Sequence, residues 1–396
     1  MQLDLAKDLA RHLRGGHPWV FRKALTSPPR APAGTVVDVT SGGRFVARGL
    51  YDPLSPIAVR LLTRDPAEEV GPALWQRRLA RAAALRRETL GILAPGADDA
   101  FRLVHGENDF LPGVVIDVYA GFAVVKLYSA AWTPHRAALV EALRQAVPGL
   151  RGVFGRDEVA REDDERGGGG RPLWGAAPPA RLLVREAGAR LWVDVRRGQK
   201  TGLFLDQREN RVALRRYAPG REVLDCFCFT GAFAVHLALG GARKVTCVDV
   251  DGGAIELARE SFRENGLDPG AHEFRQADVF DQLALYRREG RSFDLIVLDP
   301  PAFAKSQAKV EAAVAGYAAL NRAALQLLRP GGYLATASCS ARVPPERFAG
   351  AIAEAAGKLG LPLQLVEERR QPPDHPVLVS FPQGAYLKLL IYRLPG

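Results

Sequence analysis

The stretch "EVLDCFCFTGAFAVHLALGGARKVTCVDVD" (residues 222–251) contains two short apolar runs separated by a helical pattern. Each run has the length of a buried strand, and an acidic residue lies near its end, Asp225 in the first and Asp249 in the second. A strand, a helix and a second strand in this order are typical of a βαβ unit with two parallel strands. This stretch therefore predicts the parallel sheet of an α/β fold.

The same alternation extends over residues 186–396. Further apolar runs follow in "FDLIVLDPP" (293–301) and "GYLATASCS" (332–340), and the helical pattern "GGAIELARESFRENG" (252–266) ends on Asn-Gly, a helix stop. Strands that alternate with helices predict a mostly parallel, doubly wound, Rossmann-like sheet with helices on both faces.

Acidic residues recur where each predicted strand ends: Asp225, Asp249, Asp278 and Asp299. Ligands of open α/β sheets bind at the carboxyl ends of the strands, so four acids there predict one binding crevice. The first loop keeps Gly231 but lacks the G-x-G-x-x-G of a pyrophosphate site, which argues against NAD. Each acid alone could be a helix N-cap, but four in succession favour a binding site.

S-adenosylmethionine has an ammonium, a ribose and an adenine but no phosphate, and it fits this pattern. We expect Asp225 to bind the ammonium, Asp249 the ribose hydroxyls, and Asp278, beside Val279, the adenine amino group. Loop residues and the fourth acid complete the predicted pocket: Phe227, Thr230, Gly231 and Asp299. No metal site is expected.

The sequence "LDPPAF" (298–303) is predicted to end the fourth strand. Two prolines hold the backbone extended beside Asp299. Pro300 and Phe303 are therefore candidates for contacts to a flat base, with Phe303 stacking on it.

Cys339 follows the next strand and should lie near this loop, ahead of a helix predicted to begin around Pro344 and Pro345. A thiolate there could add to carbon 6 of a pyrimidine and so activate carbon 5 for methylation, with Asp299 holding the cytosine amino group and ring nitrogen. The alternative is that Cys339 is a small buried apolar residue. Its polar neighbours Ser338 and Ser340 favour chemistry, whereas Cys226, Cys228 and Cys247 are expected to pack in strands.

Composition indicates a soluble protein of several domains with a polyanionic partner. The 396 residues carry a net charge of +10, and residues 1–65 hold ten Lys or Arg against five Asp or Glu. A genome-wide arginine bias would explain part of this charge. Without a signal sequence or an apolar span, and with no disulfide framework among four cysteines, we expect a cytoplasmic protein without membrane contact.

Three domains are predicted. Residues 1–66 form a β module in which Arg14, Trp19, Arg22 and Lys23 combine basic and aromatic side chains suited to RNA, although Trp19 and Phe21 could instead belong to its core. Residues 67–185 form a central α+β domain whose "REDDERGGGG" segment predicts a flexible loop near 161–172. Residues 186–396 form the catalytic domain.

Five motifs together resemble the RlmI family of bacterial large-subunit rRNA cytosine-5 methyltransferases. They are "GQKTGLFLDQREN" (198–210), "LDCFCFTGAFAVHLALGGARKVTCVDVD" (224–251), "FDLIVLDPPAFAKS" (293–306), "ATASCS" (335–340) and "DHPVLVSFPQGAYLK" (374–388). The "GHPWVF" stretch (16–21) is similar to that family's PUA domain, an RNA-binding pseudo-barrel. The resemblance implies a class I methyltransferase fold, Cys339 as nucleophile, and cofactor contacts from Thr201, Gln207 and Arg208.

The chain differs in one respect from better-described RNA cytosine-5 methyltransferases, which usually carry a second cysteine after the proline pair. "DPPAF" has none, so removal of the carbon-5 proton needs another group, with His375 or a polar loop residue as candidates.

Other functions stay open at this point: methylation of an adenine or guanine amino group, a non-catalytic RNA-binding assembly factor, or, less favoured, an NAD oxidoreductase. A homodimer is also considered.

Overall fold

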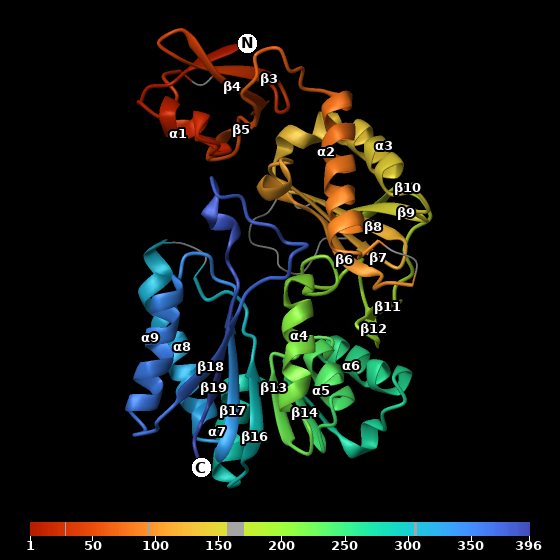
Figure 1. The fold of residues 1–396 in the computed structure, drawn as a ribbon, viewed down its shortest axis with the longest axis vertical. Helices are drawn as coiled ribbons and strands as arrows, with labels where there is room; N and C mark the ends of the chain where they lie inside the picture. Colours follow the sequence, from red (N-terminus) through yellow and green to blue (C-terminus); the bar gives the residue numbers. More distant parts are fainter. Residues whose placement is uncertain (28, 94–95, 157–169, 305–306) are drawn as a thin grey trace. The chain divides into compact units, whose positions relative to one another are not determined.

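The computed structural model describes residues 1–27, 29–93, 96–156, 170–304 and 307–396 (Figure 1). They form two compact units, the first of residues 1–182, 194–205 and 373–384, the second of residues 183–193, 206–372 and 385–396. Segments 194–205 and 373–384, which we expected within the catalytic domain, thus group with the N-terminal unit. Within the described residues, no helix combines the length and apolar character that crossing a membrane requires.

The N-terminal part of the first unit is a five-stranded sheet in the order β1-β3-β4-β5-β2. Its elements are β1 (Gln2–Asp4), α1 (Ala10–Arg14), β2 (Trp19–Phe21), β3 (Val36–Ser41), β4 (Arg44–Tyr51) and β5 (Ile57–Thr63). Alternating apolar residues of these strands, among them Val37, Val39 and Val59, pack into one core. The small β module predicted from the alternation is confirmed.

The central part is a second sheet, in the order β10-β9-β8-β7-β6, with two helices. Its elements are α2 (Pro72–Ala84), β6 (Ala100–His105), β7 (Val114–Tyr119), β8 (Phe122–Leu127), α3 (Arg136–Ala146), β9 (Gly152–Arg156) and β10 (Arg171–Gly175). Of the predicted flexible loop, residues 161–169 lie outside the described residues. Its end is corrected, because Arg171 and Pro172 pair with β9 as the start of β10.

The second unit is built on a seven-stranded sheet in the order β15-β14-β13-β16-β17-β19-β18, in which the pairs from β15 to β17 are parallel and β19 runs antiparallel to both β17 and β18. Its strands are β11 (Leu182–Glu186) and β12 (Ala189–Val193), which pair outside the large sheet, then β13 (Glu222–Cys226), β14 (Lys244–Asp249), β15 (Glu273–Gln276), β16 (Phe293–Leu298), β17 (Leu328–Ser338), β18 (Gln364–Arg369) and β19 (Lys388–Arg393). The predicted doubly wound sheet is confirmed.

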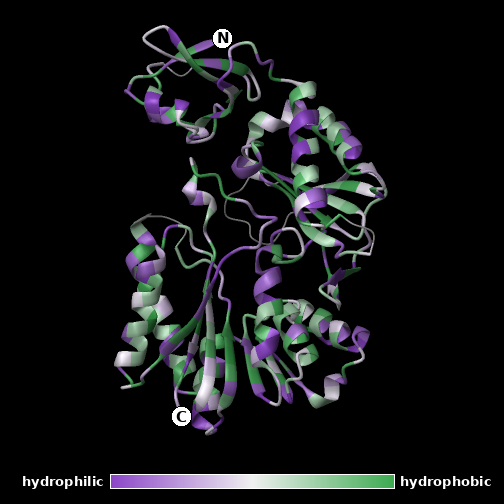
Figure 2. Ribbon diagram, in the orientation of Figure 1, coloured by the Kyte–Doolittle hydropathy of each residue, from purple (hydrophilic) through white to green (hydrophobic). Residues whose placement is uncertain are grey.

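Helices cover both faces of this sheet (Figure 1). They are α4 (Arg208–Leu214), α5 (Ala232–Leu239), α6 (Gly252–Glu264), α7 (Val279–Arg288), α8 (Val310–Leu325) and α9 (Pro345–Gly357). In Figure 1, α4, α5 and α6 lie on one side, and α7, α8 and α9 on the other. The strands between them are mainly hydrophobic (Figure 2), and residues such as Ile296, Phe293 and Tyr317 are fully buried.

The turn between β13 and α5 depends on Gly231. Its φ of 72° lies in the left-handed region, and a Cβ there would come within 2.6 Å of the Ala258 Cβ on α6. Glycine avoids both the left-handed penalty and this clash.

We expect Gly231→Ala to lower the free energy of unfolding by about 2–4 kcal/mol, which combines left-handed strain with overpacking. The matched control is Gly220→Ala, because Gly220 has a φ of +71° but no atom within 4 Å of the added Cβ. The control should lose only about 1 kcal/mol. Urea unfolding of both variants measures the difference, and equal losses would contradict the close approach to α6.

Candidate active site

The sheet topology brings the predicted acids to one edge. Asp225 is the penultimate residue of β13, Asp249 ends β14, and Asp299 directly follows β16. Asp278 follows β15 and precedes α7. Because β15, β14, β13 and β16 are parallel neighbours, their carboxyl ends lie side by side.

Asp225 is fully buried, and neither of its carboxylate oxygens has a hydrogen-bond partner among the residues that the structure describes. Burial raises the pKa of its carboxyl well above the usual range, and the negative charge of Asp299 raises it further. The Ala234 amide offsets part of this effect, although it does not reach hydrogen-bond geometry. A buried acid without a donor is costly, and a cationic ligand would compensate it.

Asp249 is also buried, but both of its oxygens accept backbone hydrogen bonds, from the amides of Phe229 (2.8 Å) and Asp251 (2.9 Å). Burial raises the pKa of its carboxyl, while these amides lower it. Asp249 thus holds the loop that follows β13, and each oxygen keeps a second lone pair for a ligand.

That loop has an unusual backbone. Phe227 and Phe229 have φ angles of 60° and 48°, a region that side chains larger than glycine rarely occupy. Thr230 is buried, and its hydroxyl has no hydrogen-bond partner within the described part of the chain. Strained backbone and an unpaired hydroxyl beside Asp225 are features of binding loops.

Asp278 is exposed and is the N-cap of α7, since its Oδ1 accepts hydrogen bonds from the amides of Phe280 and Asp281. Asp278 is therefore a helix N-cap, as the alternative interpretation of the sequence predicted. A ligand would have to bind the second oxygen of its carboxylate. Val279 beside it is buried in the core.

Asp299 is oriented by a chain of polar side chains. The Nε2 of Gln207 donates to Asp299 Oδ1 (3.0 Å), and the Oε1 of Gln207 accepts from Asn210 Nδ2 (2.6 Å). Asn210 in turn accepts from Arg369 Nε (3.1 Å). Gln207 thus lies beside Asp299 at the strand ends, and Arg208, also buried, begins α4; the cofactor contacts expected of both stay predictions.

Cys339 directly follows β17, and its side chain is partly exposed. β17 pairs with β16 in parallel register, Thr336 opposite Leu298, so Cys339 lies at the same sheet edge as Asp299. Its neighbours are anchored in the interior: the hydroxyls of Ser338 and Ser340 lie 2.9 and 3.1 Å from the Tyr317 hydroxyl. The serines therefore fix the turn that presents the thiol.

The other three thiols differ from Cys339. Cys226, Cys228 and Cys247 are buried, and burial raises the pKa of each thiol. They stay protonated near neutral pH and pack, as predicted.

Lys388 was not identified from the sequence, although it ends the last motif. It begins β19, is paired with Ser338 in antiparallel register, and is 5% exposed. Its Nζ donates to the carbonyls of Ser340 (2.7 Å) and Val343 (2.8 Å), which belong to the turn after Cys339. Burial lowers the pKa of Lys388 to about 8, and its interaction with Cys339 opposes that effect.

The proline loop has a packed aromatic side. The Phe303 ring lies 4.7 Å from the Tyr317 ring at an interplanar angle of 32°, so one face is covered. Pro300 is buried. Stacking of a base on Phe303 would have to use its edge or its other face.

Thr201 and His375 belong to the first unit. Thr201 Oγ1 donates to Asp117 Oδ2 (2.6 Å) and lies 2.8 Å from the Tyr119 hydroxyl. His375 is buried with its Nδ1 3.0 Å from Asp374 Oδ1. Both side chains thus have structural partners, and a cofactor contact of Thr201 stays a prediction.

The four predicted RNA-contact residues of the N-terminal module divide into two pairs. Trp19 Nε1 donates to Glu107 Oε1 (2.7 Å), and its ring packs on Phe381, which supports the packing interpretation. Arg22 donates to the carbonyls of Asp52 and Ser55. Arg14 and Lys23 are exposed and accessible to a partner.

Comparison with protein families agrees with this site. A model of S-adenosylmethionine-dependent methyltransferases matches residues 102–393, and a PUA-like domain matches residues 3–64. The chain belongs to the S-adenosylmethionine-dependent methyltransferase family. Its cofactor is S-adenosylmethionine, as predicted.

Similar proteins cover the full chain. It is 40% identical over 395 residues to the ribosomal RNA large subunit methyltransferase I of Klebsiella pneumoniae, covering 98% of this chain and 96% of that protein. A Streptococcus mutans protein described as a SAM-dependent methyltransferase shares the fold with a TM-score of 0.86 at 25% identity over both full chains. A methyltransferase solved in complex with SAH has the same TM-score at 24% identity, also over both full chains.

The residues present fit S-adenosylmethionine. The orphaned carboxylate of Asp225 and the unpaired hydroxyl of Thr230 offer acceptors for an ammonium, and Asp249 offers acceptors for hydroxyls. Within the described residues, no cluster of three or more His, Cys, Asp or Glu side chains is suited to a metal ion.

We expect Asp225→Asn to stabilise the cofactor-free protein and to abolish cofactor binding. Because folding raises the pKa of Asp225, the unfolded chain loses this proton at lower pH. Wild-type stability therefore falls as the pH rises from about 4 through the raised pKa. Asn does not titrate, so the free energy of unfolding of the cofactor-free variant should exceed that of wild type by about 1 kcal/mol at neutral pH.

Thermal unfolding from pH 5 to 8, with and without S-adenosylmethionine, measures both effects. The cofactor should raise the Tm of wild type but not of Asp225→Asn. Glu289→Gln, at an exposed acid after α7, is the control and should respond to cofactor like wild type. A wild-type cofactor response in Asp225→Asn would contradict the assignment.

Proposed function

We propose that this enzyme transfers a methyl group from S-adenosylmethionine to carbon 5 of a cytosine in large-subunit rRNA, through a covalent adduct with Cys339. The main support is the position of Cys339: a partly exposed thiol that lies at the same sheet edge as Asp299 and interacts with the buried ammonium of Lys388. The rRNA substrate is supported by the 40% identical relative and by the PUA-like domain.

Carbon 5 of cytosine is too weak a nucleophile to accept a methyl group unaided. In the proposed reaction, the Cys339 thiolate adds to carbon 6, which makes carbon 5 an enamine carbon. S-adenosylmethionine supplies an electrophilic methyl group on its sulfonium. After methylation, carbon 5 loses its proton to a base, the bond between carbon 6 and sulfur breaks, and the thiolate is regenerated.

Asp299 would hold the cytosine during this sequence. Gln207 donates a hydrogen bond to Asp299 Oδ1, which holds this carboxyl group in place at the strand ends. A carboxyl group can accept the cytosine amino hydrogen and, when protonated, donate to the ring nitrogen, which withdraws electrons and favours addition at carbon 6. Asp299 therefore serves both orientation and activation in the proposed mechanism.

Lys388 would favour the thiolate of Cys339. A cation near a cysteine lowers the pKa of the thiol, and burial strengthens the effect because the local dielectric is low. Two carbonyls of the turn fix the ammonium, so its position relative to the thiol is defined. Tyr317, anchored by Ser338 and Ser340, interacts with the same thiol from the opposite element, α8.

The first test identifies the product. Unmodified large-subunit rRNA is incubated with the enzyme and methyl-labelled S-adenosylmethionine, digested, and its nucleosides separated. We expect label in 5-methylcytidine, and its loss in Cys339→Ala but not in Cys247→Ala, which removes a buried thiol. Label in a methylated adenine or guanine, retained in Cys339→Ala, would instead support an amino-group methyltransferase.

The second test concerns the adduct. RNA that contains 5-fluorocytidine cannot release a carbon-5 proton, so the enzyme should remain covalently bound to it after methylation. A denaturing gel should show this complex with wild type and not with Cys339→Ala. Its absence with wild type, while 5-methylcytidine is formed on normal RNA, would contradict covalent catalysis.

Lys388→Met should raise the pKa of the Cys339 thiol, because a buried positive charge is removed. The pH profile of alkylation at Cys339 measures this, and kcat at neutral pH should fall about tenfold. Lys388→Arg keeps the charge and should recover part of the rate. An unchanged alkylation profile in Lys388→Met would leave Lys388 with only its role in holding the turn.

A further inference from the structure

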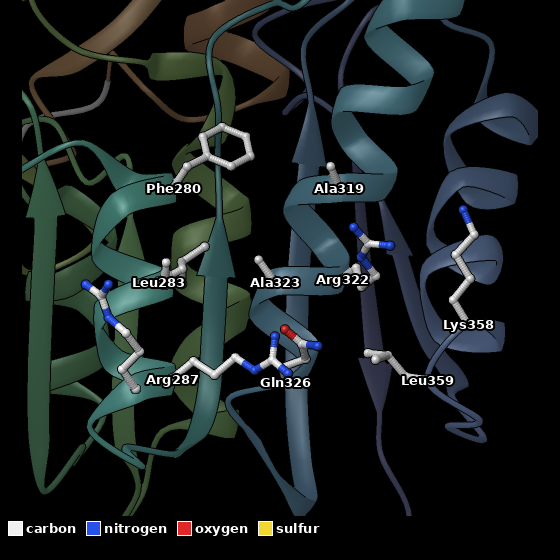
Figure 3. A pocket seen from close by; sticks show the side chains of 11 residues that line it. Phe280, Leu283, Arg287, Ala319, Arg322, Ala323, Gln326, Lys358 and Leu359 are labelled. Atoms are coloured by element: carbon white, nitrogen blue, oxygen red, sulfur yellow. The ribbon is translucent and has the colours of Figure 1, made fainter.

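In the second unit, which we call the catalytic unit because it carries the sheet with the four acids, a groove lies on the helical face (Figure 3). It has a volume of about 730 Å³ and lies between α7, α8 and the end of α9. Its floor is apolar, with Leu283 and Ala284 on α7, Ala319 and Ala323 on α8, and Leu359 after α9. Leu283 and Ala284 are adjacent on α7, and Ala319 and Ala323 are four residues apart on α8. Each helix therefore presents apolar side chains from one of its faces to the groove.

Among the described residues that line the groove, four are cations and none is acidic: Arg287, Arg288, Arg322 and Lys358. Figure 3 shows Arg287 on α7, Arg322 on α8 and Lys358 beyond α9, so the positive charges come from three separate elements. Lys358 pairs with Glu354 one turn earlier. In the described part of the chain, the three arginines form no ion pair or side-chain hydrogen bond, and all three are exposed, although Glu354 also interacts electrostatically with Arg322.

Exposed arginines around apolar side chains suit a ribose–phosphate backbone. The guanidinium groups can each bind a phosphate oxygen pair, and the floor can contact the sugars. Phe280, at the other end of the groove and 41% exposed, offers a ring on which a base can stack. An acidic protein surface would match the charge alone, whereas a nucleic acid offers both the phosphates for the arginines and a base for the exposed ring.

We propose that this groove binds the phosphate backbone of the rRNA outside the nucleotide that is methylated. The inference rests on the proposed function, since it takes the rRNA of that proposal as its partner. The ten residues of α7 span about 15 Å, and Asp278 caps its cofactor end whereas Arg287 and Arg288 lie in its last turn. The arginines therefore contact a flanking segment, and the groove determines affinity rather than chemistry.

The test compares Arg287→Gln/Arg322→Gln with Arg243→Gln/Arg263→Gln. Both double variants remove two exposed arginines from the same unit, but only the first pair lies in the groove. Binding of unmodified large-subunit rRNA is measured as a function of salt, together with KM and kcat for methylation. Removal of each arginine that binds a phosphate should reduce the slope of log K against log[salt] by about one.

We expect the groove variant to bind several-fold more weakly, with a slope reduced by about two, a higher KM and an unchanged kcat. The control should lose less affinity, and both variants should keep the wild-type Tm increase with S-adenosylmethionine. If the groove variant keeps wild-type affinity and slope while the wild-type enzyme methylates the rRNA, the proposal for the groove is overturned and the proposed function is not. Absence of rRNA binding by wild type would overturn the groove and the proposed function together.

Discussion

Parallel pairing of β13 with β14 on one side and β16 on the other is the constraint on which the catalytic unit depends. It brings Asp225, Asp249 and Asp299 to one edge although they are far apart in the chain. The acids then affect one another: the loss of water and the charge of Asp299 raise the pKa of Asp225. The cofactor-free site is thus electrostatically unfavourable, and a cationic ligand removes that cost.

The turn after β17 combines rigidity with an accessible thiol. Ser338 and Ser340 point inward to Tyr317, whereas the residue between them is partly exposed. Alternation along an extended chain produces this arrangement, because successive side chains point to opposite faces. Lys388 closes the turn from β19 through two carbonyls. The thiol of Cys339 is therefore presented by a framework that is itself buried and hydrogen-bonded.

The acids and Cys339 of the candidate active site belong to one compact unit, and the predicted RNA-contact residues of the N-terminal module belong to the other. Trp19 is half-buried, and its indole donates a hydrogen bond to Glu107. We expected this aromatic residue to contact RNA, but it stabilises its own unit instead. Exposed cations remain there in Arg14 and Lys23, and the catalytic unit has its own basic groove at Arg287 and Arg322. The net positive charge of the chain is thus spread over separate surfaces.

The sequence alone determined the sheet type, the cofactor and the acids at the strand ends, because strand and helix periodicity and the residue after each strand are local properties. It did not reveal Lys388, since only the antiparallel return of β19 brings that residue to Ser338. The sequence also did not reveal that Thr201 donates a hydrogen bond to Asp117, or that Gln207 orients Asp299 through another hydrogen bond. Contacts between residues far apart in the chain follow from packing, and only the tertiary structure decides them.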